Sequence, residues 1–140
     1  MQLTLHTDYG LRVLIYLTQR PTATISELAE YYQLSRNHLV KVVNALGKHG
    51  FIVTTRGKGG GIRLAREPRD ISVGDVVRRM ETHFDVVECL RESYSHPACK
   101  ALPFCGLRKA VQLATERFLS DLDGHTLASV VPPILTGKSP

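Results

Sequence analysis

The chain has 140 residues, a formal net charge of +5 and 43% hydrophobic residues, which is enough material for one domain with a real core. Its three cysteines are an odd number, and this argues against the disulfide framework of a small secreted protein. No charged-then-apolar leader opens the chain, and no apolar run reaches the roughly 18–20 residues of a membrane span, so we expect a cytoplasmic protein without a membrane partner.

The charge is uneven along the chain. Residues 1–80 hold 12 Lys and Arg against 6 Asp and Glu, whereas residues 81–140 hold 6 against 7. A basic first part and a nearly neutral second part favour a polyanionic partner for the first part only. A solvated basic face would give the same count, so the predicted elements must decide between the two.

The first predicted helix begins near Thr7, whose hydroxyl is a suitable N-cap. Leu11, Leu14 and Leu17 follow at helical spacing, and Pro21 ends the element. The sequence therefore opens with one amphipathic helix.

Two further helices are predicted, joined by a tight turn. Thr24 and Glu27 form a capping box at the start of a short second helix. Ser35 then caps a third helix, which Gly47 or Gly50 ends. The apolar face of this third helix consists of Leu39, Val42, Val43 and Leu46. This arrangement is typical of a helix-turn-helix whose second helix is basic at its start.

A β-rich run over 51–55 and an alternating run over 62–65 predict a hairpin with a basic, glycine-rich tip, which is the wing of a winged helix. The tip lacks the spacing of a nucleotide-binding phosphate loop, and a strand follows it instead of a helix. We expect Arg56 and Lys58 to contact DNA, with Gly59 and Gly60 allowing a close backbone approach. The alternative to a DNA contact is a turn whose glycines merely allow positive φ.

A fourth helix follows, with an apolar stripe of Val73, Val76, Val77 and Met80.

The first turns of the third helix carry the candidate base and phosphate contacts. Arginine pairs with guanine and asparagine with adenine, each worth about 1–3 kcal/mol of discrimination. For Ser35 the favoured role is only a cap, and for Lys41 only a phosphate contact. The candidates are Ser35, Arg36, Asn37, His38 and Lys41.

The cysteines Cys89, Cys99 and Cys105 are separated by nine and then five residues. Thiolates are soft ligands that favour zinc, copper(I) or iron–sulfur clusters, and three of them leave such a site one ligand short. His83 and His96 are the nearest candidates for a fourth ligand, of a zinc site or of a Rieske-like 2Fe–2S centre. Both histidines could equally be ordinary surface residues.

A late amphipathic helix repeats apolar residues at intervals of three and four, namely Leu107, Val111, Ala114, Phe118 and Leu122. It could pack on its own domain, but a protein that reads duplex DNA usually needs two copies, so a homodimer is favoured. We expect a mainly α fold with one small hairpin. A winged helix-turn-helix is predicted over 1–80, with the wing at about 51–65, and a cysteine-containing segment that could bind the metal or cluster over 81–106. A dimerisation helix with a short C-terminal segment is predicted over 107–131, and a flexible tail over 132–140.

Residues 3–14, 34–41 and 56–65, together with the cysteine segment, resemble the bacterial family of winged-helix iron–sulfur regulators from residue 1 to about residue 130. The cysteine spacing is most similar to that of the nitric oxide-sensing repressors in this family. The resemblance implies an iron–sulfur cluster held by the three cysteines. A 4Fe–4S cluster is favoured, and a 2Fe–2S cluster is the alternative. It also implies Asp8 of the other subunit as the fourth ligand. From the residues alone, Asp8 is a carboxylate in the first turn of a helix, where the macrodipole favours it.

The expected function is a nitric oxide-sensing repressor of nitrosative-stress genes, which binds double-stranded operator DNA as a cluster-containing homodimer and is released by nitric oxide. A regulator that senses iron, cluster supply or redox state is the nearest alternative. An iron–sulfur electron-transfer protein and a zinc-stabilised DNA-binding module are alternatives of other kinds. Because the sequence has no nucleophile elbow, no His-Glu-x-x-His and no Walker pair, we do not expect an enzyme.

Overall fold

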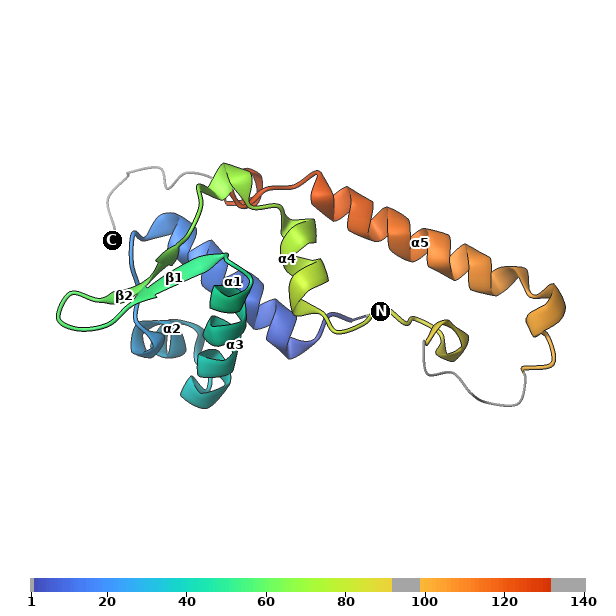
Figure 1. The fold of residues 1–140 in the computed structure, drawn as a ribbon, viewed down its shortest axis with the longest axis horizontal. Helices are drawn as coiled ribbons and strands as arrows, with labels where there is room; N and C mark the ends of the chain where they lie inside the picture. The colour runs from blue at the N-terminus through green and yellow to red at the C-terminus, as the bar shows by residue number, and fades with distance from the viewer. Residues whose placement is uncertain (1, 92–98, 132–140) are drawn as a thin grey trace.

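Helices make up most of the chain in this computed structural model, which describes residues 2–91 and 99–131 (Figure 1). The α-helices are α1 (Leu5–Gln19), α2 (Ile25–Tyr32), α3 (Arg36–Lys48), α4 (Val73–Met80), α5 (Gly106–Asp123) and α6 (Leu127–Val130). The strands are β1 (Ile52–Thr55) and β2 (Gly61–Leu64), and short 3₁₀ turns are η1 (Pro68–Asp70), η2 (Glu88–Leu90) and η3 (Leu102–Phe104). The predicted mainly α fold with one small hairpin and a long late helix is confirmed.

The start of α1 differs from the prediction. Thr4, not Thr7, is the N-cap: its hydroxyl accepts a hydrogen bond from the backbone N–H of Thr7 at 3.3 Å. Thr7 lies three residues further on, inside the first turn, and its side chain is fully buried. Both threonines suit a cap, and the prediction chose the wrong one because Thr7 has a tertiary partner that the local pattern does not reveal.

The helix-turn-helix is formed by α2 and α3. The predicted capping box is confirmed, since the Thr24 N–H donates to Glu27 Oε2 at 2.6 Å and the Glu27 N–H donates to Thr24 Oγ1 at 3.2 Å. Ser35 occupies the N-cap position of α3, although its side chain makes no capping hydrogen bond. Of the two glycines proposed to end α3, Gly50 follows the helix with a φ of +73°.

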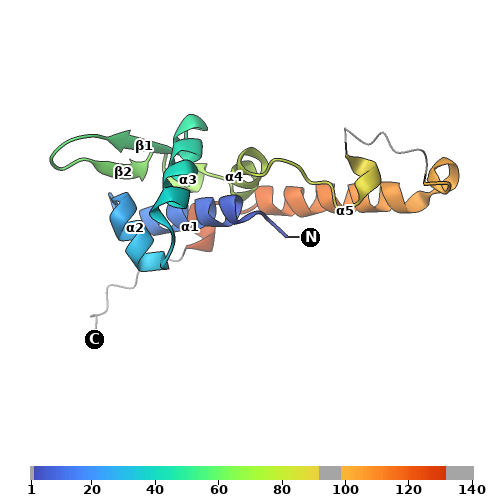
Figure 2. The same cartoon turned by 90° about the horizontal axis from the view of Figure 1, so that it is seen from below.

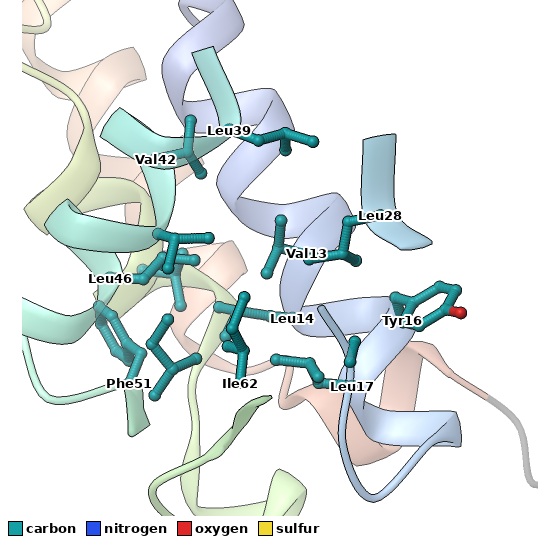
Figure 3. Close-up of a cluster of buried hydrophobic side chains, with 14 of the residues drawn as sticks. Val13, Leu14, Tyr16, Leu17, Leu28, Leu39, Val42, Leu46, Phe51 and Ile62 are labelled. Carbon is teal, nitrogen blue, oxygen red and sulfur yellow. The ribbon is translucent and has the colours of Figure 1, made fainter. Parts of the chain in front are cut away.

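The core lies between α1, α3 and the hairpin (Figure 3). Apolar side chains from these elements leave water together, which is the main favourable term in folding. α4 packs against α1 through its predicted stripe, of which Val76, Val77 and Met80 are buried, and Val76 and Met80 join the same core. The labelled core residues include Val13, Leu14, Leu39, Val42, Leu46, Phe51 and Ile62.

The wing is an antiparallel hairpin in which Thr55 pairs with Gly61 and Ile52 with Leu64. An isolated bridge from Ala23 to Ile62 ties the hairpin to the segment before α2. A Cβ atom on Gly60 would lie 2.2 Å from the carbonyl oxygen of Thr55, so the turn has no room for any other residue there. The predicted wing is therefore confirmed, with a tip that depends on glycine.

α5 extends away from the winged helix, and both views place its start far from α1 and its end beside α4 (Figures 1 and 2). The chain then returns to the winged helix, where the Leu127 N–H donates to the Ile71 carbonyl at 3.0 Å and Leu127 is fully buried. None of the helices in the described part of the chain combines the length and the apolar character that a membrane crossing requires. The tail predicted for 132–140 lies outside the described residues.

Candidate functional site

Four of the five candidate residues on the recognition helix α3 are exposed at its start, namely Ser35, Arg36, Asn37 and Lys41. Arg36 Nη1 donates to Ser26 Oγ, so the guanidinium spans the two helices of the helix-turn-helix. Arginine and asparagine at the start of an exposed recognition helix are suited to base edges, and a lysine one turn later is suited to phosphate.

His38 is placed differently from its neighbours. It is half-buried, and its ring faces α1, with centroid distances of 4.8 Å to Tyr9 and 6.2 Å to His6. The rings of α1 contact one side of His38, and its half-buried side chain remains a candidate DNA contact. Its position also makes it a contact between the recognition helix and the helix that carries Asp8.

The wing tip presents the exposed side chains of Arg56 and Lys58. Residues 51–66 contain no acidic residue, so no carboxylate within the hairpin neutralises these cations. Gly59 is exposed with a φ of +81°, and Gly60 closes the turn through its N–H, which donates to the Gly57 carbonyl at 3.0 Å. The tip is a narrow cationic projection that could approach a phosphate backbone.

Asp8 lies in the first turn of α1 and pairs with Arg12, whose Nη2 is 2.8 Å from Asp8 Oδ2. The Asp8 side chain is 38% exposed, so a second molecule could reach it. Exposed ion pairs of this kind contribute only about 0–1 kcal/mol, which makes the Arg12 contact easy to exchange for another.

Glu81 holds the start of α1 in place. Its Oε2 atom accepts hydrogen bonds from the Thr4 backbone N–H at 3.0 Å, from Thr4 Oγ1 at 3.2 Å and from Thr7 Oγ1 at 2.7 Å. Glu81 directly follows α4 and begins the segment that leads to Cys89. Sequence reasoning missed this residue, because nothing in the local pattern signals contacts over 74 to 77 residues.

His6 lies between these contacts. Partial burial, and then the charge of neighbouring His38, lower the pKa of His6, whereas the Glu81 carboxylate opposes the change. The first turn of α1 is therefore in electrostatic contact both with the recognition helix and with the start of the cysteine segment.

The cysteines occupy η2 and the approach to α5. Cys89 is half-buried in η2, Cys99 is exposed, and Cys105 is half-buried at the N-cap position of α5, where the helix dipole favours negative charge. Among residues 2–91 and 99–131, no three His, Cys, Asp or Glu side chains of one chain are close enough together to hold a metal ion. His83 is exposed, and His96 lies outside the described residues.

The donors nevertheless have the right chemistry for an iron–sulfur cluster. Three thiols lie within 17 residues, and one partly exposed carboxylate could come from a second copy. Thiolate sites are commonly organised by the metal itself, because binding and local folding are coupled. The three thiols and the Asp8 carboxylate therefore suit an iron–sulfur cluster chemically, but the described residues of a single chain do not bring them together.

The helix-turn-helix, the exposed recognition helix and the basic wing define a winged-helix DNA-binding protein. Residues 3–133 match the model of the Rrf2 family, described as iron-dependent transcriptional regulators. The chain belongs to this family and is a transcriptional regulator.

Two kinds of relative support this assignment. The HTH-type transcriptional regulator NsrR of Bacillus subtilis (strain 168) is 45% identical over 134 residues, which cover 94% of this chain and 90% of the relative. The solved structure of T. potens IscR is 27% identical with a TM-score of 0.71, over 93% of this chain and 85% of that one. CymR, the global cysteine regulator of B. subtilis, is 25% identical with a TM-score of 0.65, over 94% and 96% of the two chains.

Proposed function

We propose that this protein is a nitric oxide-sensing transcriptional repressor, acting in the cytoplasm on operator DNA as a homodimer that holds an iron–sulfur cluster. The observation that carries the proposal is the position of the first turn of α1. It bears Asp8 and lies between Glu81, at the start of the cysteine segment, and His38, on the recognition helix. The 45% identity to a regulator named NsrR supports the same function.

In this proposal Cys89, Cys99 and Cys105 hold the cluster, and Asp8 of the second copy is the fourth ligand. A 4Fe–4S cluster is favoured over a 2Fe–2S cluster. When bound, the cluster supplies iron that reacts with nitric oxide. Asp8 offers a carboxylate oxygen, which is a harder ligand than thiolate and less well matched to iron, so Asp8 is the ligand that is displaced most easily. Once released, Asp8 can return to Arg12, the partner it has in this structure.

Asp8 thus has two alternative partners, the cluster of the other subunit and Arg12 of its own helix. A ligand that favours one of two such states shifts the population of the whole molecule. Because Tyr9 and His6 contact His38, movement of the first turn of α1 changes the support under the start of α3. We propose that this contact transmits the loss of the Asp8 bridge to the DNA-reading surface.

The proposed DNA contacts on α3 are Arg36 and Asn37 on bases, His38 through the part of its side chain that stays exposed, and Lys41 on phosphate. On the wing they are Arg56 and Lys58, on phosphate or in the minor groove. Ser35 remains at the N-cap, and Gly59 and Gly60 allow the wing backbone to approach closely. Two such surfaces in a dimer would read two half-sites of an operator about one helical turn apart.

The second copy is proposed to bind along the free part of α5. Phe104 in η3 is 82% exposed, and Leu107 and Leu113 on α5 are 63% and 43% exposed. Large apolar side chains left in water favour an interaction surface, and we assign these three to it. A homodimer would cover them and would also bring Asp8 of one chain toward the cysteines of the other.

A regulator that senses iron supply or redox state with the same residues is the second candidate. The description of the family as iron-dependent regulators favours it. An electron-transfer protein is set aside, because the chain belongs to a family of transcriptional regulators. Response to nitric oxide, compared with response to an iron chelator, distinguishes the two remaining candidates.

The test is a gel shift of a promoter duplex with cluster-loaded, cluster-free and nitric oxide-treated protein under anaerobic conditions. We expect only the loaded form to bind tightly, and the loaded protein to be brown and to bleach with nitric oxide. Asp8→Ala should change the visible spectrum, whereas Asp70→Ala, an exposed aspartate in η1, should not. Equal binding by all three forms would remove the proposal, and a colourless zinc protein would indicate a DNA-binding module without this sensor.

A further inference from the structure

The end of α5 meets α4 with no space between the two helices. A Cβ atom on Gly74 would lie 2.1 Å from Asp123 Oδ1 and 2.7 Å from the backbone nitrogen of Asp123. Such distances are far below ordinary van der Waals contact, so only glycine permits this approach. A backbone atom cannot turn aside as a side chain can, and any larger residue at position 74 must push the helices apart.

Asp123 also fastens the two helices together. Arg78 Nη1, on α4, donates to Asp123 Oδ1, and Ser72 Oγ donates to the Asp123 carbonyl at 3.4 Å. Just beyond, the Val73 N–H donates to the His125 carbonyl at 2.8 Å. The end of α5 is thus held by a side-chain ion pair, by the Ser72 hydroxyl and by a backbone hydrogen bond. Gly74, Arg78 and Asp123 are called here the α4–α5 joint.

Packing contacts through α4 and α1 connect the joint to the recognition helix α3. α4 is buried against α1, and at Gly10 an added Cβ atom would lie 2.9 Å from Met80 Cε, which shows how closely these helices pack. α1 in turn packs against α3. Because close-packed interiors do not deform continuously, the direction of α5 relative to α3 is set where α5 meets α4.

Small rotations at the joint have large effects at the other end of α5. The helix has 18 residues, so it is about 27 Å long, and a tilt of about 10° moves its far end by about 5 Å. The rise per base pair of DNA is about 3.4 Å. A dimer that joins along α5 would therefore change its half-site spacing by a base pair or more if the joint moved by this amount.

We propose that Gly74, Arg78 and Asp123 are positioning residues that set the spacing between the two operator half-sites this regulator accepts. The inference rests on the proposed function as a DNA-binding dimer. None of the three residues belongs to the proposed DNA contacts or cluster ligands. The Arg78 and Asp123 side chains are 40% and 45% exposed, so their ion pair contributes little to global stability. We expect its removal to act mainly by letting the angle between α5 and α4 vary.

The test uses full-length, cluster-loaded protein and duplexes built from the half-site that the wild type selects from a random duplex library. Two copies of this half-site are placed at a series of spacings that differ by single base pairs, and affinity is measured by fluorescence anisotropy. We expect the wild type to prefer one spacing at least about tenfold over its neighbours, a difference of about 1.4 kcal/mol. Asp123→Ala should reduce that preference to less than about threefold, while its affinity for a single half-site stays within twofold of wild type.

The matched control is Asp121→Ala, because Asp121 lies on the same last turn, its side chain is 83% exposed, and that side chain has a weak 3.9 Å contact with His125 Nε2. It should keep the wild-type spacing preference. Gly74→Ala provides a second variant, with folding checked by circular dichroism, and it should move the preferred spacing instead of flattening the series.

Three results would count against the inference or its basis. If Asp123→Ala and a folded Gly74→Ala both keep the wild-type spacing profile, the inference is wrong and the proposed function stands. If single half-site affinity falls as much as two-site affinity, the joint supports the DNA-reading surface itself and does not set spacing. A wild-type protein that selects no duplex would overturn the proposed function, and the inference with it.

Discussion

The rings of Tyr9 on α1 and His38 on α3 meet with their centroids 4.8 Å apart and their planes inclined by 59°. Tyr9 directly follows Asp8, so a single side-chain contact separates the proposed cluster ligand from the recognition helix. On the other side of the same turn, Thr7 is bound to Glu81. The proposed sensing and DNA-reading parts therefore share one turn of helix.

Tyr9→Ala should uncouple these two parts. An aromatic pair is worth about 0.5–1.5 kcal/mol beyond its buried area, so we expect the ratio of operator affinity before and after nitric oxide to fall by about two- to tenfold. Iron and sulfide content should stay at the wild-type value. Tyr9→Phe keeps the ring and should restore the ratio, and an unchanged ratio in Tyr9→Ala would exclude this contact as the route.

Thr7→Val should destabilise the fold without changing its shape. The buried hydroxyl of Thr7 donates to the Glu81 carboxylate at 2.7 Å, and a hydrogen bond to a charged group is worth about 1.5–3 kcal/mol. Because Glu81 is only partly buried, water can replace the lost donor, and we expect a loss of about 1–2 kcal/mol in urea unfolding. Thr54→Val, on the exposed side of β1, is the control and should stay within about 0.5 kcal/mol of wild type.

Removing either wing cation should lower the salt dependence of operator binding. Each phosphate contact contributes about 0.9 to the slope of log affinity against log salt concentration, so Arg56→Ala and Lys58→Ala should each reduce the slope by about that amount. Arg69→Ala removes an exposed arginine in η1, outside the proposed surface, and should leave the slope unchanged. Identical slopes for all four proteins would show that the wing does not contact the backbone.

The capping box of α2 should make a small, pH-dependent contribution to stability. The backbone N–H of Thr24 donates to the Glu27 carboxylate and lowers the pKa of Glu27 below its ordinary value. Since the folded pKa is the lower one, the stabilisation is present above the ordinary pKa and is lost as the pH falls through the lowered value. Glu27→Gln keeps an acceptor but does not titrate, so its melting temperature should lie below that of wild type at neutral pH, with a gap that closes in acid.

The local elements were predictable because their signals are local. The Thr24–Glu27 capping box, the glycine tip of the wing and the apolar stripe of α4 each depend on residues within one short helix or one hairpin. Thr7 shows the limit of such reasoning. Its hydroxyl suits a cap, but burial against Glu81 assigns it another partner, and Thr4 caps the helix instead.

The candidate site was predictable in residue type more than in arrangement. The cysteine spacing indicates metal chemistry, yet within the described residues one chain does not bring three possible metal ligands together. We propose that a second copy supplies the fourth ligand. His38 has the sequence position of a base contact, and the local pattern does not reveal that its ring also packs on Tyr9 of α1. Glu81 and the Gly74–Asp123 contact depend on residues about 50 to 80 positions apart, for which a single sequence has no periodic signal.

We propose above all that the state of the cluster controls DNA binding. The most direct measurement is one anaerobic titration of cluster-loaded protein with nitric oxide, in which visible absorbance and the anisotropy of a labelled operator duplex are followed in the same cuvette. We predict that the duplex is released in step with the loss of cluster absorbance, and that Asp8→Ala shows weak binding from the start. Full bleaching of the cluster with the duplex still bound would contradict the claim.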